Sequence, residues 1–313
     1  MGRYVLRRLL QAIPVLLGTT FLIFAIVYAL PGDPLQALAG EKRVDPVFAA
    51  AMREQFHLNE PLIVRYGYYL RDIVSGNFGT TFRGLPVSTI FEGKFQVTFK
   101  LTMMALLFEA VIGVGLGFFA ALRRGKSADK AILAFTLLLV SVPTLVSGFV
   151  LQLVLGVKLK QITGLDIFPV AGVQDGVRSY LLPGFVLATV SIAYMTRLTR
   201  TSLMETLRAD YVRTAVAKGM PRRRVLGRHA LRNSLIPMVT YLGTDLGTFM
   251  GGAVITETIF NLPGIGQQLF QSVYLRENPV VVGIVTVLVL VYIVANLVVD
   301  LLYAVLDPRI RYE

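Results

Sequence analysis

The sequence predicts an all-α protein that crosses a membrane about six times. Of its 313 residues, 55% are hydrophobic and only 16% are charged, and the mean hydropathy is +0.65. A soluble chain of this length needs more polar residues to cover its surface. The chain contains no cysteine, which excludes disulfide frameworks, thiolate zinc sites and cysteine nucleophiles.

Six segments have the length and apolarity of a transmembrane helix, which needs about 20 mostly apolar residues to cross the hydrocarbon core. The first is preceded by three arginines but is too long for the apolar part of a typical signal peptide, so we expect it to be retained. Pro143 predicts a kink in the third segment, because proline removes a backbone donor. The six predicted spans are Leu9–Leu30, Leu101–Leu122, Ala131–Val157, Ser179–Thr196, Ser234–Thr256 and Asn278–Val299.

The distribution of lysine and arginine predicts that both termini lie in the cytoplasm. With that orientation the cytoplasmic segments hold 19 basic and five acidic residues, whereas the outer segments hold 12 basic and 11 acidic residues. The excess of positive charge therefore falls on one side of the membrane, as the positive-inside rule expects. The net charge of +12 needs no nucleic-acid partner to explain it.

We expect one transmembrane domain over residues 1–313, with two connections long enough to have a role of their own. Residues 31–100 form a predicted extracytoplasmic excursion with helical stretches at Pro46–Phe56 and Pro61–Ile73. Residues 197–232 form a basic cytoplasmic loop. Long connections in compact proteins usually bind something.

The cytoplasmic loop predicts two short helices at an angle. Tyr211–Lys218 contains no helix breaker, Asp210 is suited to the N-cap, and Gly219 is suited to the left-handed position after the helix. Pro221 can begin the second helix in its first turn. Such a loop either docks into a groove on another protein or lies as a basic segment on anionic lipid, and charge alone favours the lipid.

The stretch Ala215-x-Ala217-Lys218-Gly219, followed by Arg228–Asn233, resembles the cytoplasmic signature loop of bacterial ABC importer permeases, and specifically that of the dipeptide/oligopeptide branch. In that family the loop forms the coupling helix, which seats in a cleft of the ATPase subunit and transmits its closure to the membrane domain. The resemblance therefore implies a coupling loop at residues 211–226.

The resemblance covers nearly the whole chain in order. Arg213 and Thr214 stand where the general family pattern has glutamate and alanine, and Arg232 stands where many families have proline. Both departures are familiar within the dipeptide/oligopeptide branch, so they favour this branch over other ABC importer permeases. The other matching segments are Leu30–Pro34, His57–Leu70, Gly76–Gly79, Glu257–Gly266 and Leu306–Arg311, and those between His57 and Gly79 resemble the first, B-type, peptide permease.

The family implies a type I ABC importer permease in the cytoplasmic (inner) membrane of a bacterium. Such a subunit forms the pathway for dipeptides or oligopeptides as a heterodimer with a second homologous permease. Two ATPase subunits, or a fused pair, would bind the ATP and Mg, and an extracytoplasmic solute-binding protein would deliver the solute. The chain itself would bind no cofactor and would not be an enzyme. The residues implied in ATPase coupling are Tyr211, Arg213, Ala215, Ala217, Lys218, Gly219, Arg222 and Arg223.

The fifth span carries the candidates for helix packing or for the pathway. Gly243, Gly247 and Gly251 recur every four residues and form a ridge that permits close helix contact. This ridge either packs within one bundle or lies near the subunit axis beside the pathway. Asp245 either pairs with a positive charge on a partner or solute, or accepts hydrogen bonds from neighbouring threonines, and Glu109 in the second span is equally ambiguous.

A stand-alone secondary transporter or channel is the alternative function. It would predict broken helices in matched halves or a chain of membrane acids, and the sequence has neither an internal repeat nor such a chain. A membrane-bound enzyme is less compatible still, because His57 and His229 fall on opposite sides of the predicted membrane. The segment Arg124–Ser127 superficially resembles the end of a phosphate-binding loop, but it lacks the leading glycine and the preceding strand.

Overall fold

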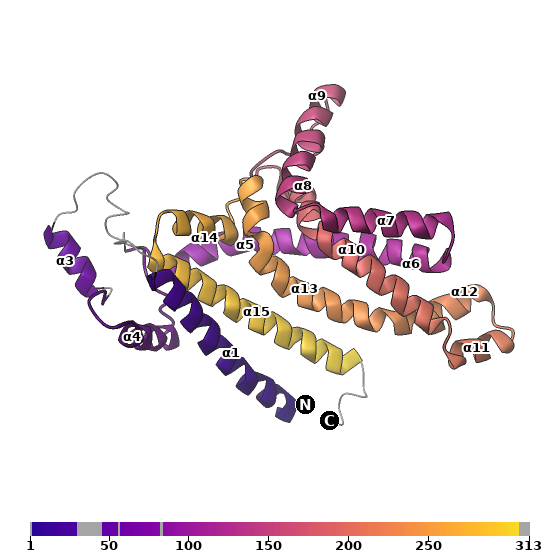
Figure 1. The fold of residues 1–313 in the computed structure, drawn as a ribbon, viewed down its shortest axis with the longest axis horizontal. Helices are drawn as coiled ribbons and strands as arrows, with labels where there is room; N and C mark the ends of the chain where they lie inside the picture. The colour runs from indigo at the N-terminus through magenta and orange to yellow at the C-terminus, as the bar shows by residue number, and fades with distance from the viewer. Residues whose placement is uncertain (1, 30–45, 56, 82–83, 307–313) are drawn as a thin grey trace. The chain divides into compact units, whose positions relative to one another are not determined.

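The computed structural model describes residues 2–29, 46–55, 57–81 and 84–306, and they form an all-helical fold (Figure 1). The described residues contain no β-strand beyond a single bridge between Thr80 and Pro86. The longest helices are α1 (Gly2–Ala29), α5 (Val87–Phe108), α10 (Leu181–Thr206), α13 (Arg232–Ile259) and α15 (Asn278–Leu306). The segments Leu30–Pro34 and 307–311, which carry part of the family resemblance, lie outside the described residues.

Shorter elements connect the long helices, and several continue them as π-helical turns. The π-helix Glu109–Gly113 joins α5 to α6 (Val114–Leu122), and the π-helix Gln152–Lys158 joins α8 (Thr144–Leu151) to α9 (Leu159–Thr163). A 3-10 turn at Gly176–Tyr180 leads into α10. The remaining helices are α3 (Pro46–Gln55), α4 (Leu62–Val74), α7 (Ser127–Ser141), α11 (Asp210–Ala217), α12 (Arg222–Arg224) and α14 (Ile265–Tyr274).

Five helical stretches of the described residues are long and apolar enough to cross a membrane. They are Arg7–Tyr28, Val87–Leu122, Thr144–Thr163, Gly176–Thr206 and Asn278–Val299. The predicted span Ser234–Thr256 lies in α13, which has the length but is not one of the five, because threonines, glycines and Asp245 lower its hydropathy. The all-α membrane architecture is thus confirmed. The helices expected at Pro46–Phe56 and Pro61–Ile73 correspond to α3 and α4.

The prediction of one kinked span at Ala131–Val157 is wrong, because the helix is interrupted there. α7 ends at Ser141, and Val142 takes an extended conformation with φ −95° and ψ 121°. Pro143 then precedes the first residue of α8. Proline disfavours helical geometry in the residue before it, and Figure 1 shows α8 and α9 leaving the direction of α7 steeply. The effect of Pro143 is therefore a break and not a kink.

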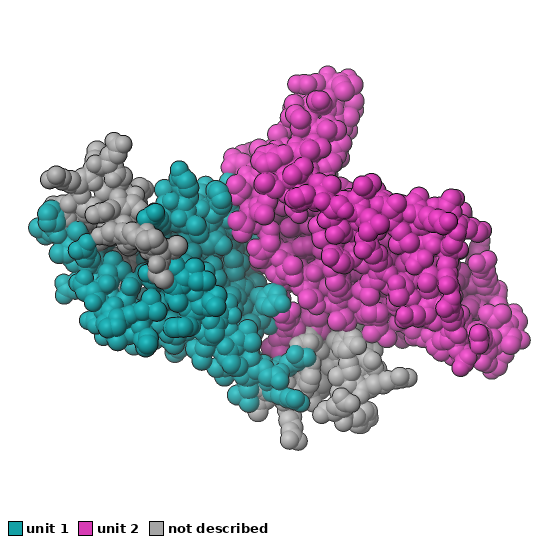
Figure 2. Space-filling view, viewed as in Figure 1, with its two compact units in different colours: residues 1–98, 262–294 teal, residues 99–261, 295–313 magenta. Residues whose placement is uncertain are grey.

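The described contacts divide the chain into two compact units, drawn in separate colours in Figure 2. Unit 1 comprises residues 1–98 and 262–294, and unit 2 comprises residues 99–261 and 295–313. The helices α5 and α15 contribute residues to both units. In unit 1, Phe24 and Val27 of α1 pack with Val281 and Val282 of α15.

The helix α10 is the centre of unit 2, where it packs against α6, α7, α8 and α13. Most of its residues are buried, and small side chains let its neighbours approach closely. Gly113 and Gly117 lie four residues apart, so they share the face of α5–α6 that meets α10. Close glycine contacts of this kind are typical of helix pairs in membranes.

Candidate functional site

The basic loop that follows α10 folds as a helix–turn–helix with its own small core. Val212 and Ala215 of α11 pack with Val225, and Met220 covers them. The side chains of Val212, Ala215 and Val225 are at most 4% exposed. After α12 the chain passes through the π-helix Val225–Leu231 directly into α13. The apolar contact therefore connects α11 to the helical segment that continues into α13.

The turn at Gly219 has the geometry that the sequence predicts. Gly219 has φ +71°, and its N–H donates to the carbonyl of Val216 while the N–H of Met220 donates to that of Ala215. These two bonds form a Schellman motif, in which the residue after the C-cap is left-handed. The prediction that Asp210 is the N-cap is wrong by one position, because Ala209 occupies the cap and Asp210 is the first helical residue.

Most of the predicted coupling residues lie on the exposed surface of this loop. Tyr211, Arg213, Ala217, Lys218, Arg222 and Arg223 are all exposed. Ala215 differs, since it is 4% exposed and its methyl group packs inside the loop. The Tyr211 hydroxyl accepts a hydrogen bond of 2.9 Å from Nδ2 of Asn233 at the start of α13. The loop thus presents an aromatic and basic surface and joins it to α13 by one apolar and one polar contact.

A buried ion pair anchors α10 ahead of this loop. Nε and Nη2 of Arg200 donate to the two carboxylate oxygens of Asp129 over 2.7 and 2.9 Å, and the N–H of Gly125 also donates to Asp129. The Asp129 side chain is only 3% exposed. The hydrogen bonds from Arg200 hold the pKa of Asp129 below its ordinary value. This bidentate pair ties the first turn of α7 to α10.

Replacing Asp129 with asparagine is expected to lower the free energy of unfolding by about 3–5 kcal/mol, because Arg200 keeps its charge without a buried partner. The depressed pKa means that the pair stabilises the wild type fully above about pH 4 and loses this effect as pH falls through the folded-state pKa. Thermal melting in detergent at pH 7 and at lower pH measures both effects. The exposed pair Arg71–Asp72, at 3.6 Å, supplies the control Asp72→Asn, which should cost less than about 1 kcal/mol. Equal melting of the two variants would contradict the anchoring role.

The three glycines of the α13 ridge, Gly243, Gly247 and Gly251, do not share one environment: two pack inside the chain and one is exposed. A Cβ at Gly243 would collide with Val299 of α15, so this glycine packs within the chain. A Cβ at Gly251 would meet nothing within 4 Å, and Gly251 is exposed, whereas Gly247 is buried. Gly251 belongs to an exposed stripe on α13 made of Thr244, Thr248, Gly251, Ile255 and Thr258.

Asp245 faces another acid of the same chain. Glu109, at the start of its π-helix, is fully buried and lies beside Asp245, which is 6% exposed. The Ser191 hydroxyl of α10 also interacts with Asp245. Among the described residues, no donor reaches either carboxyl oxygen of Glu109 or Oδ2 of Asp245. Two uncompensated charges in such a place would cost several kcal/mol, so the two carboxyl groups do not both carry an unneutralised charge.

The interpretation of Asp245 as an acceptor for neighbouring threonines is wrong. The hydroxyls of Thr244 and Thr248 donate instead to the backbone carbonyls of Thr240 and Thr244. Threonine in a helix commonly makes this bond to the carbonyl four residues earlier. Asp245 is directed into unit 2, toward Glu109 and Ser191, and not toward the exposed stripe.

Replacing Glu109 with glutamine is expected to preserve or raise stability, by up to about 3 kcal/mol, because the amide keeps the shape and supplies N–H donors to Asp245. Asp245→Asn should likewise leave assembly intact. Glu109→Ala should instead lose about 2–4 kcal/mol, since it leaves a cavity. Thermal melting in detergent measures these changes, with the exposed Glu92→Gln as the control. A glutamine variant that melts far below the wild type would contradict the facing arrangement.

Comparison with known proteins identifies the chain. The sequence profile of the binding-protein-dependent transport system inner membrane component matches residues 113–312. A second profile, for the N-terminal part of such membrane components, matches residues 1–88. The chain belongs to this permease family. The prediction of an ABC importer permease is thereby confirmed, and the alternative of a stand-alone secondary transporter or channel is not favoured.

Curated relatives extend this permease assignment over the full length. The dipeptide transport system permease protein DppB of Escherichia coli (strain K12) is 36% identical, with 100% of each chain covered. The oligopeptide transport system permease protein AppB of Bacillus subtilis (strain 168) is also 36% identical over 100% of both chains. The glutathione transport system permease protein GsiC of Salmonella choleraesuis (strain SC-B67) gives the same values.

Solved structures support the fold of the permease. A chain of the MetNI methionine ABC transporter, in an inward-facing conformation, superimposes with a TM-score of 0.57. It is 18% identical, and the match covers 70% of this permease and 97% of that chain. At that identity the likeness shows a shared fold and no more.

Two features of the permease were not predicted from its sequence. The pairing of Glu109 with Asp245 joins two residues that are 136 positions apart, and its only signal was that each of their spans carries a single acid. The Arg200–Asp129 pair was also missed, although an acid in a short basic connection is a signal that it has a partner. Both depend on which helices are neighbours, which one sequence does not state.

Proposed function

We propose that this permease conducts dipeptides or longer peptides across the inner membrane of a bacterium, with its termini in the cytoplasm. The single observation that carries the proposal is the full-length similarity to peptide permeases. The loop supports it, because α11 and its C-cap expose Tyr211, Arg213 and Lys218. A second homologous permease completes the pathway. Two ATPase subunits, or a fused pair, bind ATP and Mg, and an extracytoplasmic solute-binding protein delivers the peptide.

The contacts of the loop support a route from ATPase closure to the membrane. A cleft of the ATPase would hold the exposed surface of α11, and its closure would move α11 as a unit with its apolar core. Val212 and Ala215 would then transmit the movement to Val225 and so to α13. The exposed stripe of α13 (Thr244, Thr248, Gly251, Ile255 and Thr258) consists of threonine and glycine with one large apolar side chain, Ile255. Its small and polar members suit close contact with the second permease beside a watery pathway.

The experiment that tests this proposal is a mild-detergent purification of the tagged chain from its native membranes, with ATPase activity assayed on the eluate. We expect a second permease and ATPase subunits to co-purify, with vanadate-sensitive hydrolysis. After reconstitution into proteoliposomes, peptide uptake should follow ATP and not an ion gradient. A chain that elutes alone, without hydrolysis, would contradict the proposed assembly.

A further inference from the structure

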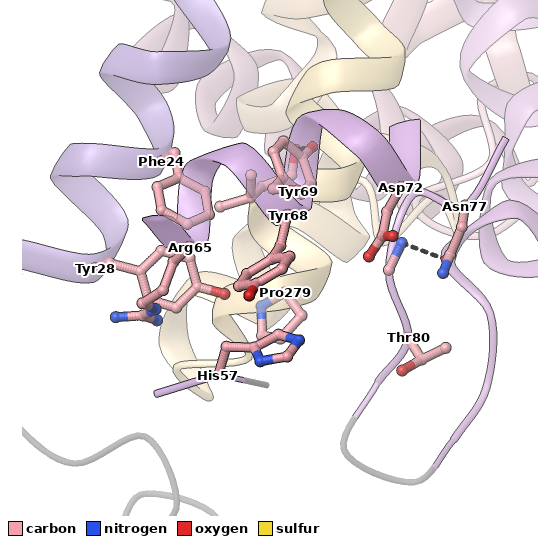
Figure 3. A pocket seen from close by; sticks show the side chains of 12 residues that line it. Phe24, Tyr28, His57, Arg65, Tyr68, Tyr69, Asp72, Asn77, Thr80 and Pro279 are labelled. Atoms are coloured by element: carbon pink, nitrogen blue, oxygen red, sulfur yellow. Dashed lines mark hydrogen bonds between the residues drawn. The ribbon is translucent and has the colours of Figure 1, made fainter. Parts of the chain in front are cut away.

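Unit 1 contains a cavity of about 290 Å³ that the coupling route does not use (Figure 3). Its walls come from the last turns of α1, one face of α4, the first turn of α15 and the segment around Asn77–Thr80. Figure 3 shows Arg65 close to Tyr28 at one end of the cavity and Asp72 toward the other end. Aromatic rings and one guanidinium group therefore dominate the end near α1.

The cavity lies at the level where two membrane spans meet water. The apolar stretch of α1 ends at Tyr28, and that of α15 begins at Asn278. Phe24 and Tyr28 line the cavity from α1, and Pro279 and Val282 line it from α15. Tyrosine is enriched at this depth because its ring is apolar and its hydroxyl is wet. The lipid headgroups of one leaflet occupy the same depth.

The helix α4 has the features of a helix that lies in the membrane interface. Its inner face is fixed by two tyrosines: the Tyr66 hydroxyl is 2.9 Å from Oγ1 of Thr20 in α1, and the Tyr69 hydroxyl is 2.7 Å from Oγ1 of Thr286 in α15. Thr20 and Thr286 both lie inside apolar spans, so this face of α4 reaches into the bilayer region. Its outer face exposes apolar side chains, with Ile63 76% and Val74 89% exposed. Such a surface is typical of interfacial helices.

Arg65 is placed to bind an anion in this cavity. Its guanidinium carbon lies 4.1 Å from the centre of the Tyr28 ring and 5.9 Å from that of Phe24, which holds the group in place. The Arg65 side chain also interacts with the Tyr28 hydroxyl, but its Nε and Nη2 atoms are buried and have no acceptor among the described residues. A buried donor without a partner is costly. The neighbouring carboxylate of Asp72 is instead 3.6 Å from Arg71.

We propose that this cavity binds the phosphodiester headgroup of a membrane phospholipid, with Arg65 as its anion ligand. The planar guanidinium fork matches two phosphate oxygens, and Nε and Nη2 are the pair of donors that such a fork uses. His57 stacks on Tyr68 with ring centres 4.3 Å apart and adds ring nitrogens to the same wall. The acyl chains extend into the bilayer beside α1 and α4, so the lipid fixes α4 to the membrane interface.

The test is native mass spectrometry of the complete complex, released from detergent with stepwise activation to remove loosely bound lipid. We expect Arg65→Gln to lower the retention of the last phospholipid by at least about tenfold, since a charged hydrogen-bonded contact is lost. Arg71→Gln is the matched control, because Arg71 lies on the same helix and its side chain is 75% exposed. The Arg71→Gln complex should retain as much phospholipid as the wild-type complex. Equal retention in all three proteins would overturn the proposal.

A second measurement needs no substitution and so does not depend on how Arg65→Gln folds. A phospholipid with a photoreactive headgroup, incorporated into vesicles with the wild-type complex, should crosslink to residues at His57, Tyr68 or Thr80. Crosslinks found only elsewhere would overturn the site. Millimolar inorganic phosphate should neither compete with the crosslink nor raise the melting temperature; if it does both, the site takes free phosphate. If Arg65→Gln retains its phospholipid but binds the solute-binding protein less well, the anion is an acidic group of that protein.

Discussion

Replacing Gly117 with valine should prevent the permease from being recovered as a folded complex. A Cβ at this position would collide with the backbone oxygen of Thr196 and lie 2.5 Å from Cβ of Thr199, both on α10. Neither obstacle is the mobile end of a long side chain, so α6 and α10 would have to separate. Since α10 is the central helix of unit 2, we expect the free energy of unfolding to fall by more than about 3 kcal/mol.

Gly115 provides the control on the same helix. A Cβ there would meet nothing within 4 Å, and Gly115 is exposed, so Gly115→Val changes the same residue type without a collision. We expect its stability to differ from the wild type by less than about 1 kcal/mol. Size-exclusion profiles and melting in detergent compare the two variants. Similar loss in both would mean that valine acts through helix propensity or insertion and not through the contact with α10.

These glycines show what one sequence can and cannot say about helix packing. The spacing of Gly243, Gly247 and Gly251 predicted a contact ridge, and Gly243 does pack against Val299. Gly113 and Gly117 are also in close contact, and there the neighbouring atoms include the backbone of α10; the interposed Gly115 obscured their four-residue spacing. A small residue permits close approach, but the partner helix decides whether the approach occurs. That partner follows from the topology of the bundle, which a single sequence leaves open.

The prolines make the same point about the helices themselves. Pro14 lies inside α1 and Pro237 lies inside α13, yet Pro143 ends one helix and precedes another. Each of these prolines lacks the backbone N–H that would donate within a helix. The presence of a proline therefore predicts a kink but does not tell whether the helix ends there. Whether a helix continues past a proline depends on how its neighbours hold the two halves. The apolar run across Ala131–Val157 therefore predicted correctly that this segment is apolar and helical. It did not predict that the segment forms two helices, α7 and α8, instead of one.

The local chemistry of the basic loop was more predictable, because caps and turns depend on neighbouring residues. The left-handed glycine and the short helices on either side follow from the order of residues around Gly219. The burial of Ala215 was not predictable, because it depends on how the second helix folds back onto α11. Ala215 and Ala217 are the same residue type two positions apart, and they point to opposite environments.

Replacing Gly219 with valine is expected to uncouple ATP hydrolysis from transport, a prediction that rests on the proposed function. Gly219 has φ +71°, a conformation in which a β-branched residue is strongly disfavoured. The substitution would break the Schellman motif and so change the angle between α11 and α12. We expect ATP-driven uptake in proteoliposomes to fall by at least about tenfold, while the assembled complex still hydrolyses ATP, because local strain of about 1–3 kcal/mol is too small to unfold the bundle.

Gly219→Asn separates the backbone effect from the effect of a side chain on the docking surface. Asparagine tolerates the left-handed conformation, and a Cβ at Gly219 meets nothing within 4 Å. The asparagine variant should therefore keep uptake within about threefold of the wild type. Normal uptake by the valine variant would exclude this turn from coupling. Only valine disturbs the backbone at this position. An equal loss of uptake in both variants would therefore mean that coupling depends on contact between the ATPase and the surface at Gly219, and not on the conformation of the turn.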